Sequence, residues 1–333
     1  MNRPREWMET ISHGGRVPLW LDLLLAVATP IQAWGMRRRL AAPRVKVPAR
    51  VISYGNLTAG GTGKTPAVLE RAMAELAAGR RVAVLTRGYG APPVREPFLW
   101  TRDQPLDWRH IGDEAAMLAR RLPDLIIARS RDRVAGARAA IERGADCLIL
   151  DDGFQSVALE RDENVLVINA ANPFGNGFLL PRGTLREYPS AAARATHLLI
   201  THADRCADLD ALINQLRRWC PHAPVRLTWH APEGFERLAD GSLLPPSAFH
   251  GREVDVLCAI GDPTGFFRLL DQLGARRCET MVLRDHAVLP SSFPAGARPL
   301  VMTEKDAARL NFHAVSDRVY VLRVRLADYA PAS

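Results

Sequence analysis

Short apolar segments alternate with amphipathic segments along the first two thirds of the chain. The apolar segments are rich in Val, Ile and Leu and end at Gly, Asp or Arg, which is typical of buried strands. They predict strands at 81–86, 125–128, 147–150, 165–169 and 197–201. Segments with helical periodicity lie between them, at 66–78, 113–121, 132–144 and 207–220. This alternation predicts an α/β fold whose parallel sheet has helices on both faces and right-handed connections.

The pattern changes after residue 222. Two short strand candidates, 225–229 and 234–243, look like a hairpin linker. Strands at 254–260, 277–283, 300–303 and 319–324 then alternate with helices at 264–273 and 305–311. We therefore predict three parts: an N-terminal helix with a basic flank (1–45), a larger α/β domain (46–222) and a smaller C-terminal α/β domain (223–333).

The most apolar stretch of the chain, 17–36, predicts an amphipathic helix that Pro30 should kink. Arg37, Arg38 and Arg39 follow it directly, as expected of a helix that lies in a membrane interface. The predicted apolar face consists of Trp20, Leu23, Leu24, Val27, Ile31 and Trp34, and the opposite side of Asp22, Thr29 and Gln32.

Three other interpretations compete for this helix. A signal peptide is disfavoured, because no A-x-A-like site follows and the flanking residues are basic. The length allows a transmembrane span, but Asp22 would then cost about 2.5–3.5 kcal/mol in the bilayer centre. From this segment alone, an amphipathic helix packed on the protein's own core is as well supported as a helix in the membrane interface. The adjacent arginines favour the membrane.

Charge is concentrated at the same end of the chain. The formal net charge is +8, and residues 1–50 hold nine basic and three acidic side chains. Such a basic segment suits an anionic partner, either a membrane surface or a nucleic acid. No interleaving of aromatic and basic residues occurs elsewhere, so we predict no nucleic acid partner. The five cysteines form no CxxC pair, which predicts free thiols and no zinc site.

A glycine-rich segment begins the larger domain. Residues 49–65 read ARVISYGNLTAGGTGKT, with a buried strand before the glycines and the helix at 66–78 after them. Strand, glycine-rich turn and helix in this order are the context of a phosphate-binding P-loop. Glycines let backbone N–H groups face phosphate oxygens, and the helix N-terminus adds a favourable dipole. The predicted phosphate-binding residues are Thr58, Ala59, Gly60, Gly61, Thr62, Gly63, Lys64 and Thr65.

Two of these residues have distinct expected roles. Lys64 can reach the β- and γ-phosphates of a nucleoside triphosphate, and the Thr65 hydroxyl is an expected Mg²⁺ ligand. The loop departs from the general pattern, which has Gly where this chain has Thr58. It groups with the GG-x-GK-[ST] loops of deviant-Walker ATPases, although those usually have Lys where this chain has Ala59.

Asp151 and Asp152 follow the predicted strand 147–150. Parallel sheets bind ligands at the carboxyl ends of their strands, where a carboxylate can hold Mg²⁺ directly or through water. The alternative is an ordinary Asp-Asp-Gly turn. With a P-loop upstream we favour Asp151 as a Mg²⁺ ligand and keep Asp152 as a second candidate.

Two further polar segments are candidates for the site. Asp113 and Glu114 stand at the start of a predicted helix, where capping is the default role of an acid. The segment 180–187, Leu-Pro-Arg-Gly-Thr-Leu-Arg-Glu, offers arginines that suit phosphate recognition, although a solvated loop is its default.

Taken in order, these motifs resemble those of the lipid A 4′-kinase (tetraacyldisaccharide 4′-kinase) family along nearly the whole chain. Each motif is weak alone, and seven in the family's order are specific. They are 55–66 (GNLTAGGTGKTP), 87–90 (RGYG), 112–114 (GDE), 150–155 (LDDGFQ), 185–187 (LRE), 285–286 (DH) and 303–306 (TEKD).

The resemblance implies transfer of the γ-phosphate of ATP, with Mg²⁺, to the 4′-hydroxyl of a tetraacyl disaccharide 1-phosphate, a lipid A precursor. It implies an enzyme at the cytoplasmic face of the inner membrane, attached through its N-terminal helix, with 46–222 as a P-loop kinase domain. By analogy Asp113 is the catalytic base and His286 its partner, brought together by domain closure, and Arg186 and Glu187 contact substrate. The chain has Ala287 where the family often has a second His, and Asp262 where it has Asn.

One alternative of another class remains, a deviant-Walker nucleotide-switch ATPase or GTPase. Such proteins act as nucleotide-gated dimers and need a basic residue in trans. Ala59 in place of their Lys disfavours this alternative, as does the tryptophan-containing N-terminal helix, which has no role in it.

Overall fold

The computed structural model describes residues 10–11, 15, 17–285, 287, 289, 296–310 and 317–330. The chain forms two compact units. One, here called the P-loop unit, consists of Met1–Leu85, Asp132–Trp229 and Ala327–Ser333. The second unit consists of Thr86–Arg131 and His230–Leu326.

A parallel sheet forms the centre of the P-loop unit, as predicted. Its strands neighbour one another in the order β8-β7-β6-β1-β5-β2 and pair in parallel. Apolar residues at successive positions bury both faces of the central strands, since helices and loops cover the sheet on each side. The strands are β1 (Arg50–Gly55), β2 (Val82–Thr86), β5 (Cys147–Leu150), β6 (Glu163–Asn169), β7 (His197–Thr201) and the first residues of β8 (Val225–Arg237).

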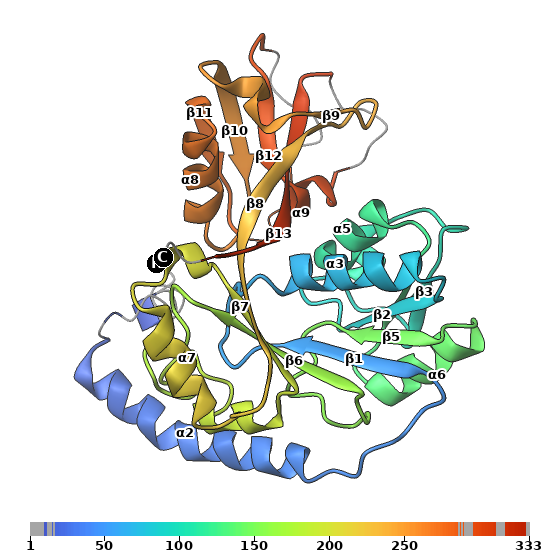
Figure 1. Ribbon diagram of the computed structural model, residues 1–333, viewed down its shortest axis with the longest axis vertical. Helices are drawn as coiled ribbons and strands as arrows, with labels where there is room; N and C mark the ends of the chain where they lie inside the picture. Colours follow the sequence, from blue (N-terminus) through green and yellow to red (C-terminus); the bar gives the residue numbers. More distant parts are fainter. Residues whose placement is uncertain are drawn as a thin grey trace. The chain divides into compact units, whose positions relative to one another are not determined.

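Helices cover both faces of this sheet (Figure 1). Helix α3 (Lys64–Ala77) lies on one face, and α6 (Arg133–Glu142) and α7 (Leu209–Arg217) lie on the other. Two of them begin at aspartate caps: Asp132 accepts from the N–H groups of Val134 and Ala135, and Asp208 from that of Ala211. The 3-10 helices η1 (Pro189–Arg194) and η2 (Ala203–Arg205) complete the unit.

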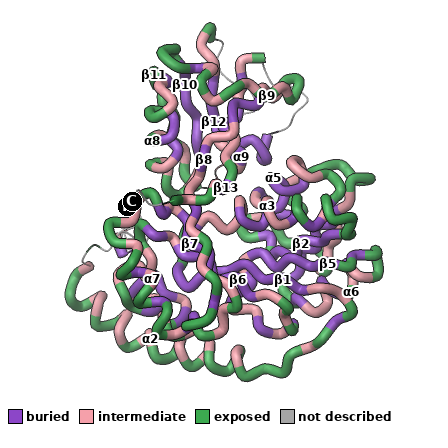
Figure 2. The backbone as a smooth tube through the Cα atoms, in the orientation of Figure 1, coloured by how far each residue is buried: buried purple, intermediate pink, exposed green. Residues whose placement is uncertain are grey.

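The N-terminal helix α2 spans Leu19–Leu40 and continues through Pro30, so it is longer than the predicted 17–36. Its length and composition would suffice to cross a membrane, and none of its residues is buried. In Figure 2 the tube of α2 is green and pink, whereas the central strands β1, β2 and β5 are almost entirely purple.

The second unit combines a segment from the middle of the chain with the C-terminal third. The middle segment contains an antiparallel pair, β3 (Phe98–Trp100) with β4 (Ile126–Arg129), and helices α4 (Trp108–Ile111) and α5 (Asp113–Arg121). The sequence analysis missed β3, which is only three residues long.

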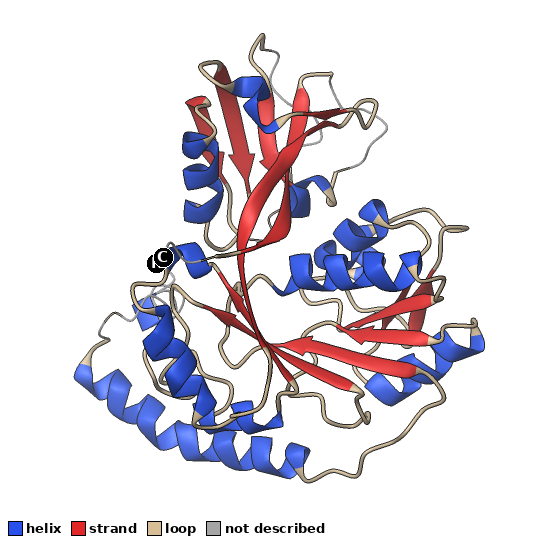
Figure 3. Ribbon diagram, viewed as in Figure 1, coloured by secondary structure: helices blue, strands red, loops and turns tan. Residues whose placement is uncertain are grey.

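The C-terminal third contributes a second sheet in the order β11-β10-β12-β13-β8, drawn in red with its helices in blue in Figure 3. The predicted strand 225–229 and the first residues of the predicted strand 234–243 instead lie in one long strand, β8, which ends at Arg237 and pairs through Phe235 and Glu236 with the short β9. The remaining elements are β9 (Leu243–Leu244), η3 (Pro246–Phe249), β10 (Glu253–Cys258), α8 (Thr264–Gln272), β11 (Arg276–Val282), β12 (Leu300–Thr303), α9 (Glu304–Ala307) and β13 (Val319–Asp328).

The grouping of Thr86–Arg131 with the C-terminal third differs from the boundary at 222/223 that the sequence suggested. Ion pairs at the end of α5 explain it. Arg121 contacts Glu304 at 2.6 Å and Glu233 at 2.8 Å, and Arg120 pairs with Glu236. Glu236 and Glu304 are buried, and breaking a buried ion pair leaves an uncompensated charge, so α5 is held firmly to the C-terminal third.

Candidate active site

The phosphate-binding loop joins the end of β1 to the start of α3. Gly60 (φ 108°) and Gly63 (φ 76°) have backbone conformations that side chains rarely allow. Apart from its chain neighbours, a Cβ atom at Gly60 or Gly61 would meet no atom of the described residues within 4 Å. Neither backbone strain nor a protein neighbour therefore requires glycine at Gly61, and this openness suits a group that approaches the backbone closely.

Neighbouring segments fix the shape of this loop. The Asn56 side-chain amide donates to the carbonyl of Thr58 at 2.6 Å, and the N–H of Ala59 donates to the carbonyl of Thr184 at 2.7 Å. The Thr201 hydroxyl donates to the carbonyl of Thr62 at 2.8 Å. Thr58 itself is buried and bridges to Leu185, which gives this departure from the general P-loop pattern a structural role.

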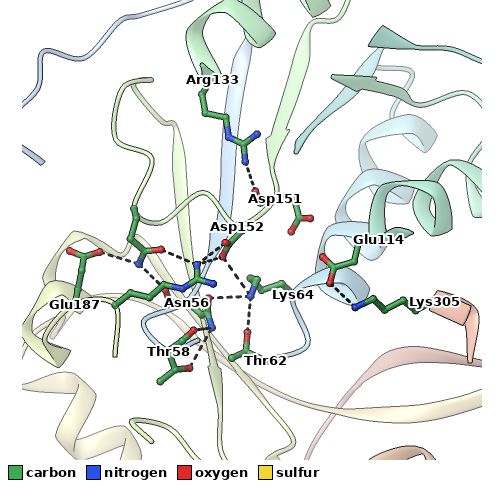
Figure 4. Close-up of polar contacts among 12 residues, drawn as sticks. Asn56, Thr58, Thr62, Lys64, Glu114, Arg133, Asp151, Asp152, Glu187 and Lys305 are labelled. Atoms are coloured by element: carbon green, nitrogen blue, oxygen red, sulfur yellow. Dashed lines mark hydrogen bonds and ion pairs between the residues drawn. The ribbon is translucent and has the colours of Figure 1, made fainter. Parts of the chain in front are cut away.

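Lys64, the first residue of α3, reaches back over the loop (Figure 4). Its Nζ lies 3.1 Å from Asn56 Oδ1, 3.5 Å from Thr62 Oγ1 and 3.6 Å from Asp152 Oδ1. All three partners are oxygen atoms that a phosphate group could replace. The ammonium group therefore lies beside the loop, where it can contact a phosphate group held by the loop.

The two predicted metal-binding carboxylates follow β5. Because β1 and β5 pair in parallel, with Ser53 opposite Leu150, the P-loop and these acids emerge at the same edge of the sheet. Asp151 is buried, and Asp152 is partly exposed with a φ of 53°. A non-glycine residue in this conformation costs about 1–3 kcal/mol, and such strain clusters at functional sites.

Arg186 holds Asp152 in this conformation. Its Nη1 lies 2.8 and 2.6 Å from the two carboxylate oxygens of Asp152. Glu187 belongs to the same network: it accepts from the Gln155 side-chain amide at 3.1 Å and from Arg194 at 2.8 Å. The structure thus brings Lys64, Asp152 and Arg186 together.

The residues at this edge suit Mg²⁺. The ion takes oxygen ligands, usually one or two carboxylates together with phosphate oxygens and waters. Asp151, Asp152 and the hydroxyl of Thr65, in the first turn of α3, are oxygen donors of this kind. The open loop beside them leaves room for the phosphates that would complete the coordination.

The predicted base, Asp113, belongs to the second unit and is the first residue of α5. The expectation that it caps this helix is wrong, because the N-cap position is Gly112 (φ 93°). A Cβ there would lie 3.0 Å from Gly88 Cα, so the two chain segments can approach only through glycine. Asp113 is buried, and its Oδ1 accepts from the N–H of Glu114 at 2.9 Å. Its predicted partner, His286, lies outside the described residues.

Sequence reasoning missed the role of Lys305, although it quoted the Thr-Glu-Lys-Asp motif. Its Nζ lies 3.7 Å from Asp113 Oδ2, 3.7 Å from Glu114 Oε1 and 3.8 Å from Asp285 Oδ1. Burial alone would lower the pKa of Lys305, but these three carboxylates outweigh it and raise the pKa above its ordinary value. A permanent positive charge therefore stands beside the predicted base.

The other residues of this motif have structural partners. Thr303 Oγ1 donates to Asp306 Oδ2 at 2.7 Å, and Asp306 accepts from the N–H of Ala259 at 3.1 Å and pairs with Arg309. Glu304 pairs with Arg121. Lys305 is thus the member of the motif that faces the predicted base.

The apolar face predicted for α2 points away from the protein. Its six side chains are 55–73% exposed, so the interpretation that this face packs on the protein's own core is wrong. The opposite side is tied to the P-loop unit: Asp22 pairs with Arg182 at 2.8 Å, and the Gln32 amide donates to the carbonyl of Arg186 at 3.2 Å. The hydrogen bond from Arg182 lowers the pKa of Asp22, which keeps this carboxylate charged.

Comparison with known proteins gives a single result. The family model described as tetraacyldisaccharide-1-P 4'-kinase matches residues 19–332. The chain belongs to this family. A tetraacyldisaccharide 4'-kinase from Anaeromyxobacter dehalogenans (strain 2CP-C) is 43% identical over 91% of this chain and 85% of that protein. One from Pelobacter propionicus is 35% identical over 93% of this chain and 88% of its own length.

A solved structure supports the same assignment. The crystal structure of LpxK from Aquifex aeolicus in complex with ATP superposes with a TM-score of 0.76, at 26% identity, over 93% of this chain and 95% of that one. The predicted α/β fold and the recognised resemblance to the tetraacyldisaccharide 4'-kinases are therefore confirmed, and the nucleotide-switch alternative is not favoured.

The two departures from the family pattern have local explanations. Asp262 Oδ1 accepts from the N–H of Thr264 at 2.9 Å, at the start of α8, a role that Asn or Asp can fill. Ala287 packs against the apolar cluster that contains Leu289 and Leu310, and its carbonyl accepts from Arg309 at 3.2 Å. The side chain of Ala287 therefore has a packing role in this chain.

Proposed function

We propose that this chain transfers the γ-phosphate of ATP to the 4′-hydroxyl of a tetraacyl disaccharide 1-phosphate, a step of lipid A biosynthesis. Family membership supplies the reaction. The observation that carries its assignment to this site is the open glycine-rich loop, with Lys64, Asp152 and Arg186 gathered at one edge of the sheet.

Phosphoryl transfer is catalysed mainly by positioning and by stabilisation of charge. In this proposal the backbone N–H groups between Thr58 and Thr65 surround the phosphates of ATP. Lys64 exchanges its contacts with Asn56 and Asp152 for phosphate oxygens. Arg186 keeps Asp152 oriented, and Glu187 holds the neighbouring Gln155 in place.

We assign Mg²⁺ to Thr65, Asp151 and Asp152. When bound, the ion neutralises the charge that develops on the phosphate oxygens. The oxygen donor set supports Mg²⁺ over softer metals. The strained conformation of Asp152 supports a functional role for this turn, in preference to the Asp-Asp-Gly turn considered as an alternative.

We assign the role of catalytic base to Asp113, which takes the proton of the acceptor hydroxyl. A base must be ionised before the reaction, and the ammonium group of Lys305 favours the charged carboxylate. Asp113, Lys305 and Asp285 all belong to the second unit, so these groups form one assembly that does not depend on the P-loop unit. The pairing of Asp113 with His286 stays a prediction.

We further propose that α2 attaches the protein to the cytoplasmic face of the inner membrane by lying in the interface. Its outward face is apolar and contains Trp20 and Trp34. Its polar side is bonded to the protein body at Asp22 and Gln32, ten residues apart, which favours a helix that lies along the protein over one that leaves it to cross a bilayer.

A transfer assay tests this function directly. Full-length protein is incubated with ³²P-labelled ATP and the acylated disaccharide 1-phosphate, with and without Mg²⁺. We expect label in the lipid fraction only when both Mg²⁺ and acceptor are present. ATP hydrolysis at the same rate without acceptor, and without labelled lipid, would support a nucleotide switch and contradict the proposal.

A further inference from the structure

A second positively charged site lies in the P-loop unit, away from the phosphate-binding loop. It is a hollow with a volume of about 260 Å³. Three arginines line it, and they come from three segments: Arg44 from the linker after α2, Arg161 from the loop before β6, and Arg194 from the end of η1. Asn164, Thr196 and the apolar Val157 and Leu159 complete the lining.

The positive charge of this hollow is poorly compensated. Among the described residues, Glu187 is the one acid that forms an ion pair with any of the three arginines, and it pairs with Arg194. Burial lowers the pKa of Arg161 to about 10, and the charges of Arg194 and Arg44 contribute to this shift. Arginines that repel one another in a shared hollow are stabilised by an anion between them.

Unused hydrogen-bonding capacity points to the same ligand. Within the described part of the chain, the Nε of Arg194 is buried without a partner, and the guanidinium of Arg44 has no hydrogen bond or ion pair. Backbone hydrogen bonds of the next residue, Val45, nevertheless fix the position of Arg44. The N–H of Val45 donates to the carbonyl of Ala158 at 2.8 Å, and the carbonyl of Val45 accepts from the N–H of Glu160 at 2.9 Å. Guanidinium groups match the geometry of phosphate oxygens especially well.

This hollow is distinct from the site of phosphoryl transfer. Asn164 is the second residue of β6 and Thr196 directly precedes β7, so the hollow lies toward the amino ends of these parallel strands. The P-loop and Asp151 lie at carboxyl ends. Between Asn164 and the last residue of β6, Asn169, a strand extends roughly 16 Å at 3.3 Å per residue. One phosphate group cannot reach both places.

The hollow also lies on the side of the sheet that carries α2. The guanidinium of Arg194 stacks on Phe154 at 4.7 Å, and Phe154 belongs to the apolar cluster against which Ala33 of α2 packs. Arg44 follows the end of α2 by four residues. The linker that carries it leads from α2 to β1 (Figure 1). Apolar and cationic surfaces that adjoin a membrane-type helix fit an amphiphilic ligand with an anionic head.

We propose that Arg44, Arg161 and Arg194 form a second phosphate site, which binds a phosphate group carried by a lipid. Two lipids offer this chemistry: the disaccharide substrate through its 1-phosphate, and an anionic phospholipid of the bilayer. The choice of the disaccharide rests on the function proposed above, whereas binding of the bilayer lipid does not depend on it.

Arg44 is the position to test, because its side chain is exposed and forms no hydrogen bond or ion pair with the described residues, so its replacement should not affect folding. Arg161 and Arg194 are unsuitable, since Arg161 also holds the carbonyls of Gly153 and Ser156 and Arg194 holds Glu187. The variants are Arg44→Gln and Arg44→Glu. Arg138→Gln and Arg138→Glu on α6 are matched controls, with the same charge change at an exposed arginine outside the hollow.

Two measurements on full-length protein distinguish the sources. If the site takes the substrate's phosphate, Arg44→Gln should raise KM for the disaccharide 1-phosphate about tenfold. It should leave KM for the 1-dephospho analogue and for ATP unchanged. If the site takes a bilayer lipid, flotation of Arg44→Gln with phosphatidylcholine vesicles that contain phosphatidylglycerol should fall about tenfold. Its flotation with pure phosphatidylcholine vesicles should not change. The KM values for the disaccharide 1-phosphate and for the 1-dephospho analogue should then shift equally. Arg44→Glu should enlarge either effect.

The proposal is overturned if both Arg44 variants match the Arg138 controls in both measurements. Failure of the proposed function looks different: the unmodified protein would transfer no phosphate to either acceptor, while the vesicle measurement would still report on the site.

Discussion

The P-loop and the carboxylate cluster around Lys305 are two charged sites built in opposite ways. The P-loop comes from one continuous segment, and its Lys64 is six residues from Thr58. The cluster combines Asp113 and Glu114 of α5 with Asp285 and Lys305, which are separated from them by more than 170 positions. The comparison teaches that a binding loop can be local, whereas the surroundings of a catalytic base depend on how distant segments pack.

The largest effect is expected from the P-loop. Lys64→Ala should lower the transfer rate by about 10³-fold or more, because it removes a positive charge from the transferred phosphate. The ³²P assay measures this. Lys46→Ala, at an exposed lysine of the same unit, is the control and should retain activity. Full activity of Lys64→Ala would remove the P-loop assignment.

A change of the base should have a different kinetic signature. Asp113→Asn should lower kcat by about 10²–10⁴-fold and change the KM for ATP little, since the carboxylate acts on the acceptor and not on the nucleotide. Asp103→Asn, at an exposed site in the same unit, serves as the control. An effect confined to the KM for ATP would show that Asp113 is not the base.

Lys305→Met should lower kcat by about tenfold at neutral pH, and it should act through the charge state of the cluster. The substitution removes a positive charge that lies 3.7 Å from Asp113 Oδ2, so the acid limb of the pH–rate profile should move to higher pH. Lys305→Arg should keep the limb where it is. An unchanged profile in Lys305→Met would mean that the lysine has only a packing role.

The neighbouring residue sharpens this test. Asp306 is fully buried and paired with Arg309, so Asp306→Asn should lower the free energy of unfolding by about 3–5 kcal/mol. Denaturant unfolding measures this loss. The pH–rate profile of the protein that remains folded should not move, which would separate a structural residue of the motif from Lys305.

The smallest effect on catalysis is expected at helix α2, whose proposed role is membrane binding. Ile31→Lys places a charge on the outward face of α2 and should weaken vesicle binding by about tenfold or more. Vesicle flotation measures this, with Thr29→Lys as the control on the opposite side. Deletion of residues 1–39 should release the protein altogether. Unchanged binding after that deletion would contradict the interfacial role of α2.

Helix α2 shows what the pattern of apolar and polar residues alone cannot decide. The pattern identified the apolar face residue by residue, but a helix packed on the core and a helix that faces a membrane have the same pattern. The structure decided between them through the polar side, because Asp22 and Gln32 bind Arg182 and the Arg186 carbonyl and turn the apolar side outward.

The sequence by itself determined the strand–loop–helix of the P-loop, the acidic strand end at Asp151 and Asp152, and the order of most strands and helices. These features depend on contiguous residues, whose backbone preferences and hydrophobic spacing can be read locally. Only the tertiary structure decided that Thr86–Arg131 joins the C-terminal third, that Lys305 stands beside Asp113, and that three arginines share one hollow. Each of these depends on charges that meet across long sequence separations, and no local pattern records which charges will meet.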